Sequence, residues 1–144
     1  MALALSLLRS AVAQQVASLS GFSESKFPFE YFQRQENTKA HKSFSIGILG
    51  VEESTERQRR AIYYVRTQVH VAFAYRMRPL DVYPVDYDLA LNTEEDVIAA
   101  VLSSYSGIQN EITIRFIRSS RELLESLEYQ IHTLEFQALH TLNP

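Results

Sequence analysis

The sequence predicts an α+β fold: a mixed, mainly antiparallel sheet of about four strands, with two helices packed on one face and a long β-hairpin arm. Three observations support this prediction. Residues 65–77 alternate between apolar and polar side chains, which is the period of a half-buried strand. At about 3.3 Å per residue, this strand spans roughly 40 Å. Two stretches, one near the N-terminus and one between Asn92 and Gly107, carry apolar residues at helical spacing.

Length and composition place limits on the function. The 144 residues fit a single domain with its own core, spanning 1–144. The chain has no cysteine, which excludes disulfides and Cys-ligated zinc and fits a reducing compartment. A net charge of −3 provides no basic field for nonspecific nucleic-acid binding. No phosphate-binding loop, dinucleotide fingerprint, zinc-protease motif or nucleophile elbow is present, so we expect neither an enzyme nor a cofactor.

The N-terminal stretch predicts an amphipathic helix that covers the sheet. Its apolar residues recur at spacings of three and four, and Gly21 is expected to end the helix. A targeting peptide is disfavoured because Arg9 interrupts the apolar run and no basic residue precedes it. One basic residue on the polar side is too few for a membrane-surface helix, and no stretch is apolar enough to span a bilayer. The apolar stripe consists of Leu5, Leu8, Val12, Val16 and Leu19.

Residues 50–64 connect a shorter predicted strand, at 43–48, to the long strand. A tight hairpin needs two to five connecting residues, so this excess is expected to project as an arm. The arm is either a solvated hairpin tip, a binding surface for carboxylates of a partner or neighbouring subunit, or a phosphate-binding segment. Its charged candidates for a partner interface are Glu52, Glu53, Glu56, Arg57, Arg59 and Arg60.

The segment after the long strand predicts a turn and then a helix. Pro79 and Pro84 are expected to end the strand and start the turn. Asn92 or Thr93 can cap a helix that Gly107 ends. We interpret the acidic run 94–96 as charges of the first helical turn rather than a catalytic cluster, because successive helical side chains point about 100° apart.

The C-terminal third contains one clear strand and one ambiguous segment. Residues 111–117 alternate as a strand, whereas 119–138 fit both helical and strand spacing. We expect a turn at 119–124 and a closing strand at 127–137, because consecutive elements usually neighbour one another. His70 and His132 could then lie on adjacent strands, but no third metal ligand accompanies them. We expect no metal site, and we place both histidines on the polar face of the sheet.

This order of elements resembles the tail-terminator proteins of long-tailed bacteriophages. The resemblance covers residues from about Leu3 to Leu139 and is strongest in layout. The stretch 69–81, with Phe73-Ala74-Tyr75-Arg76 leading into Arg78-Pro79, resembles the central strand of that family and its exit. The helix-like pattern of the C-terminal segment departs from the family's closing strand.

The resemblance implies a structural virion protein that forms a ring, expected to be hexameric, at the neck of the tail. Such a ring caps the tail tube, ends its polymerisation and joins the head-completion (stopper) protein, while the genome DNA passes through without sequence-specific binding. Assembly would take place in the host cytoplasm, with no membrane partner. Another head–tail connector and a small α/β ligand-binding regulatory domain remain alternatives. The implied subunit-facing residues of the long strand and its exit are Arg66, Gln68, His70, Arg76 and Arg78.

Overall fold

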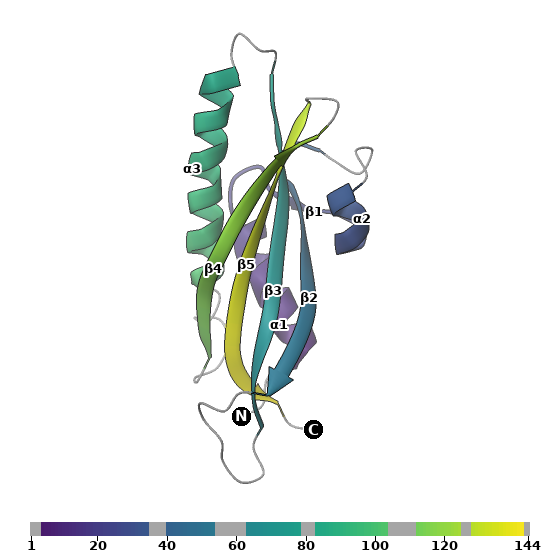
Figure 1. The fold of residues 1–144 in the computed structure, drawn as a ribbon, viewed down its shortest axis with the longest axis vertical. Coiled ribbons are helices and arrows are strands. Elements are labelled where there is room, and N and C mark those ends of the chain that lie inside the picture. Colours follow the sequence, from purple (N-terminus) through teal and green to yellow (C-terminus); the bar gives the residue numbers. More distant parts are fainter. Residues whose placement is uncertain are drawn as a thin grey trace.

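The computed structural model describes residues 4–34, 40–53, 63–78, 83–103, 112–124 and 128–142. These residues form a five-stranded sheet with strand order β1-β2-β3-β5-β4, accompanied by three helices (Figure 1). The α+β prediction is confirmed. The elements are α1 (Leu5–Ala17), β1 (Ser23–Glu24), α2 (Phe29–Arg34), β2 (Ser43–Glu53), β3 (Tyr63–Arg76), α3 (Tyr83–Leu102), β4 (Thr113–Leu123) and β5 (Tyr129–Leu142).

The predicted long strand is β3, and it lies in the centre of the sheet. It pairs antiparallel with β5 over its whole 14-residue length and, on the other side, with β2 over residues 65–73. Its alternation separates two faces as predicted. Val69, Val71 and Phe73 are buried against the helices, and we call this side the helix face. The opposite side, which carries Arg66, Gln68 and His70, is the open face.

Two helices, α1 and α3, cover the helix face, as the sequence predicted. The apolar stripe of α1 enters the core, where Leu8, Val12 and Val16 have no exposed surface. The helix ends at Ala17, with Ser18 as its C-cap, before the predicted stop. Gly21 lies in the following turn with φ of 82°, a conformation that glycine adopts without strain.

A third helix, α2, was not predicted and lies on the open face. Pro28 immediately precedes it, and its Phe29 and Phe32 are buried in a small cluster with Ala72, Ala74 and Ile131. A Cβ atom at Gly47 of β2 would lie 2.8 Å from the ring of Phe29, so glycine allows α2 to approach the sheet. The open face is therefore covered at one end.

The prediction of a second helix beginning at Asn92 or Thr93 was wrong at its start. Helix α3 begins at Tyr83, and Pro84 occupies its first turn, where a missing N–H is tolerated. Thr93 lies within the helix and its hydroxyl donates to the carbonyl of Leu89, 2.8 Å away. The acidic run 94–96 therefore lies in mid-helix rather than at the helix start.

The closing hairpin is confirmed, with a different turn. The predicted turn at 119–124 is wrong, because β4 continues to Leu123 and β5 begins at Tyr129. The two strands pair antiparallel, with a register shift between Phe116 and Arg118 that leaves Ile117 as a bulge. The ambiguous C-terminal segment is a strand because the neighbouring β4 supplies backbone hydrogen-bond partners along most of its length.

The first four residues of the predicted arm are part of the sheet. Gly50, Val51, Glu52 and Glu53 extend β2 and pair with β3, so they belong to the sheet. Residues 63 and 64 of the predicted arm begin β3, whereas 54–62, including Glu56, Arg57, Arg59 and Arg60, lie outside the described residues.

Candidate functional site

The polar side chains of the open face form one connected network. Glu135 of β5 lies between two basic groups: its Oε1 is 3.2 Å from Nε2 of His70, and Arg118 of β4 donates to both of its carboxylate oxygens. The network crosses three neighbouring strands, β3, β5 and β4. Gln68 beside it is exposed, and Arg66 is partly buried. The open face thus presents a fixed pattern of charge beside α2, whose Phe29 ring meets His70 edge-on at a centroid distance of 6.1 Å.

All three titratable groups of this network have shifted pKa values, and the hydrogen bond to Glu135 raises the pKa of Arg118. The hydrogen bonds from Arg118 lower the pKa of Glu135, against an opposing effect of partial burial. Burial lowers the pKa of His70, although the nearby Glu135 carboxylate raises it in part. Near neutral pH the network therefore holds an ionised carboxylate, a guanidinium and a neutral imidazole. These three groups are suited to polar contacts with another protein surface.

The predicted interface residues fall into two groups at opposite ends of β3. Glu52, exposed at the end of β2, lies 3.7 Å from Arg66, and Glu53 next to it is also exposed. Glu52 and Glu53 therefore lie at the same end of the sheet as Gln68 and His70. Arg76 and Arg78 lie at the other end of β3, so the structure does not bring all the predicted residues together.

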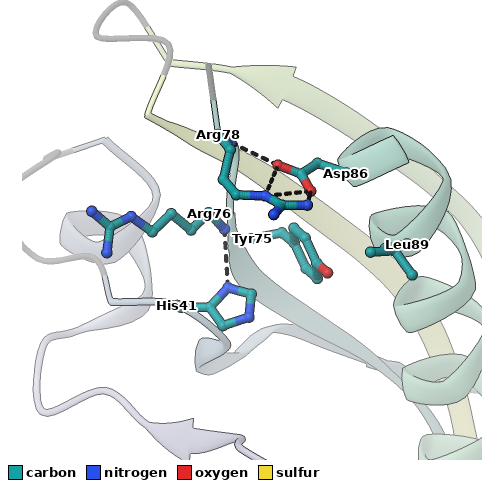
Figure 2. Close-up of a pocket in the computed structure, with 6 residues that line it drawn as sticks. All are labelled: His41, Tyr75, Arg76, Arg78, Asp86 and Leu89. Carbon is teal, nitrogen blue, oxygen red and sulfur yellow. Dashed lines mark hydrogen bonds and ion pairs between the residues drawn. The ribbon is translucent and has the colours of Figure 1, made fainter. Parts of the chain in front are cut away.

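At that other end, a pocket of about 370 Å³ opens beside the exit of β3. Figure 2 shows Arg78 facing Asp86 of α3, whereas the side chain of Arg76 points away from Asp86. The Arg78 guanidinium contacts both oxygens of Asp86, at 2.7 and 3.0 Å, and the Arg78 backbone N–H also donates to this carboxylate. Hydrogen bonds from Arg78 lower the pKa of Asp86. The ion pair fixes the start of α3 to the end of β3.

His41 lines the same pocket and also serves a structural purpose. Its Nδ1 accepts a hydrogen bond from the backbone N–H of Arg76 at 3.1 Å, and its ring packs edge-on against Tyr75. Burial lowers the pKa of His41, with Lys42 and Arg76 adding to the effect. The pocket is therefore lined largely by groups that already have protein partners.

A buried charged cluster, which the sequence did not predict, lies on the helix face. Glu94 is 4% exposed and contacts Arg121 of β4 at 2.5 Å and His132 of β5 at 2.8 Å. Ser119 donates to the same carboxylate at 3.1 Å. Burial opposes ionisation of Glu94, but the hydrogen bonds from Arg121 and His132 outweigh it, and its pKa is lowered. This cluster ties the middle of α3 to the closing hairpin.

The placement of His132 on the polar face was wrong. It lies on the helix face, fully buried, with its ring stacked on Phe73 at a centroid distance of 4.6 Å. His70 is on the neighbouring strand but on the opposite face, since it pairs with Glu135 whereas His132 pairs with Phe73. Across the described ranges, no group of three potential ligands is arranged to hold a metal ion. In those ranges no helix is long and apolar enough to cross a membrane.

Comparison with known proteins gives a fold relationship. No family model matches the sequence, and no curated protein is significantly similar to it. The structure is similar to a chain in the solved virion of a native gene transfer agent (GTA) particle. That similarity has a TM-score of 0.56 and covers 93% of this chain and 94% of the other, at 16% sequence identity. At this level of identity the two chains share a fold.

Proposed function

We propose that this protein is a structural component of a phage-like virion that forms a ring, with six subunits as the expected number, on the end of the tail tube. The observation that carries the proposal is the fold likeness to a chain of the GTA virion, which extends over nearly the whole of both chains. In the proposed role the ring ends polymerisation of the tube and joins the tail to the head-completion complex.

The open face supports this role. His70, Glu135 and Arg118 are ordered across three strands and give a subunit of a ring a fixed polar surface with which to meet a neighbour or line a channel. Mixed charge on such a lining suits genome DNA that passes through, because a strongly basic lining would retain the phosphate backbone.

The charged segment 54–62 supplies the proposed contact with an adjacent component, either the tail tube protein or the stopper protein. Reversing the charge of Arg57, Arg59 and Arg60 to Glu should leave the circular dichroism spectrum unchanged and abolish docking to the tube. Lys26→Glu, at an exposed lysine outside this segment, is the control and should dock normally. Loss of folding in the triple variant would show that the segment belongs to the core.

Another head–tail connector is the nearest alternative, and its position in the particle distinguishes it. A small ligand-binding domain is a second alternative, and it requires a closed apolar pocket between helix and sheet. The pocket at the exit of β3 is lined by Arg76, Arg78, Asp86 and His41, beside Tyr75 and Leu89, and lies at the end of the sheet. Its charged lining differs from the closed apolar pocket that a ligand-binding domain requires.

Tube capping can be tested with purified components. Tail tube protein is polymerised with and without this chain, and tube lengths and ends are measured by negative-stain electron microscopy. We expect shorter tubes that end in a ring of added density. Unchanged tube lengths, together with a strictly monomeric chain in light scattering, would refute the proposal.

A further inference from the structure

The two long edges of the sheet differ in character. On one side, β4 pairs with β5 alone among the described strands, and its 11 residues are mostly exposed, including Phe116 at 38% and Ile117 at 52%. On the other side, β1 pairs only with Ser43 and Phe44 of β2. No strand in the described ranges pairs with the outer edge of the remainder of β2. Unpaired strands of this length are templates for pairing with another chain.

The exposed apolar residues of both edges lie at the same level of the sheet. Following the register across the strands, Val51 is level with Thr67, then Ala138, then Ile114. One step further along, Ile48 is level with Val69, Phe136 and Phe116. On the β2 edge, Leu49 is 44% exposed and Val51 is 40% exposed. A second copy placed beside the first at the same height would therefore bring apolar residues of β2 against apolar residues of β4.

Charge is complementary at the same level of the sheet, where β4 carries Arg115 and β2 carries Glu52 and Glu53. The other two arginines of β4, Arg118 and Arg121, already pair with Glu135 and Glu94 within the same copy. If Val51 lies opposite Ile114, Glu52 and Arg115 become diagonal neighbours on the open face, since Glu52 pairs with Arg66 and Arg115 pairs with Gln137. Diagonal neighbours are within reach of long side chains.

The strand directions also fit. Strands β2, β3, β5 and β4 are successively antiparallel, so β4 runs antiparallel to β2. A rotation that places copies side by side around an axis keeps this relationship. Each copy would use β4 toward one neighbour and β2 toward the other, which is a head-to-tail contact that can close a ring and leave no free edge.

From these observations we infer that the β4 edge of one copy pairs antiparallel with the β2 edge of the next, so that a single sheet continues around the ring. This inference rests on the proposed ring and names the surfaces that join its subunits. The occupant of each edge is a second copy of this chain.

Disulfide trapping tests the contact directly, because the chain has no cysteine of its own. The double variant Val51→Cys/Ile114→Cys tests the unshifted register, and Val51→Cys/Phe116→Cys tests a shift by two residues. Within one copy the β2 and β4 edges are three strand spacings apart, roughly 14 Å, too far for a disulfide. Oxidation should therefore give a ladder of covalent oligomers that ends at the ring size, and Val51→Cys/Val85→Cys, with Val85 57% exposed on α3, should give none.

Mixing single-cysteine variants tests the head-to-tail geometry. Val51→Cys mixed with Ile114→Cys or with Phe116→Cys should give covalent dimers, whereas each variant alone should stay uncrosslinked. Dimers from a single variant alone would overturn the inference in favour of a two-fold contact. As a second readout, Ile117→Lys should weaken the oligomer by about tenfold or more in dissociation constant, and Val85→Lys should not.

The possible failures are distinguishable. Rings that persist in light scattering without crosslinks in either register would overturn the edge pairing and leave the proposed ring standing. A monomer at all concentrations, with and without tail tube protein, would overturn both.

Discussion

Removal of the Glu94 carboxylate provides a quantitative test of the buried cluster. Glu94 lies in mid-helix, 4% exposed, and accepts hydrogen bonds from Ser119, Arg121 and His132 on the closing hairpin. Breaking a buried ion pair by removing one partner costs roughly 3–5 kcal/mol. Arg121 keeps 32% of its side chain exposed, so its charge stays partly hydrated when the carboxylate is lost. We therefore expect Glu94→Ala to lower the free energy of unfolding by about 3 kcal/mol, the low end of that range.

Two further variants separate charge from packing. Glu94→Gln keeps the size of the side chain but offers one acceptor oxygen in place of two, so the donors at one of the two positions lose their acceptor. The loss should be about 1–3 kcal/mol, the cost of leaving a buried donor unsatisfied. Glu95→Ala changes the exposed neighbour on the same helix and should alter stability by less than about 0.5 kcal/mol. Urea denaturation followed by circular dichroism measures all three variants.

The pH dependence provides a second check on the same group. The pKa of Glu94 is lower in the folded than in the unfolded state, so its ionised form stabilises the fold above the unfolded pKa of about 4.3. That contribution disappears as the pH falls through the folded pKa, and the acid-induced loss of stability should be smaller in Glu94→Gln. Equal stability of Glu94→Ala and Glu95→Ala would refute the view that this cluster holds α3 on the hairpin.

Three other changes have definite expected outcomes. Phe73→Ala removes a fully buried ring stacked on His132 and should cost about 3–5 kcal/mol in urea denaturation, whereas a loss below about 1 kcal/mol would show that the site is not packed. Gly47→Ala places a methyl group 2.8 Å from the Phe29 ring and should lower the melting temperature by displacing α2; an unchanged melting temperature would show that α2 is not seated there. Burial lowers the pKa of all four histidines, so the unfolded state binds protons at a higher pH and the free energy of unfolding should fall as the pH drops from 7 to 5.5. Stability that stays constant or rises over that interval would contradict the burial of these side chains.

Period-two alternation predicted the sheet well because burial on one face imposes it. The runs around β2, β3 and β4 were found, and the apolar stripe of α1 was correct to the residue at Leu8, Val12 and Val16. The two-residue β1 and the six-residue α2 were missed. Elements this short are stabilised by tertiary contacts, such as the approach of Phe29 to Gly47, which leave little periodic signal.

The charged positions of α3 show where pattern reading failed. Asp86, Ala90, Glu94, Val97 and Val101 are all buried and recur at spacings of three and four along one stripe. Two of these five are carboxylates, which do not count as apolar positions. The sequence pattern therefore predicted a helix that begins too late, at Asn92 or Thr93. A carboxylate on a buried stripe requires a buried partner, and an arginine supplies it in each case: Arg78 for Asp86 and Arg121 for Glu94. Arg78 precedes Asp86 by 8 residues and lies outside the helix, and Arg121 follows Glu94 by 27 residues on another strand, so helical spacing could not identify either partner.

The most direct test of the central claim is to locate this chain in particles purified from cells that produce them. An affinity tag on the chain, labelled with gold and imaged by electron microscopy, reports its position and copy arrangement. A ring of label at the head-proximal end of the tail tube is the expected result. Label elsewhere on the particle, or particles that contain none of the chain, would contradict the proposed role.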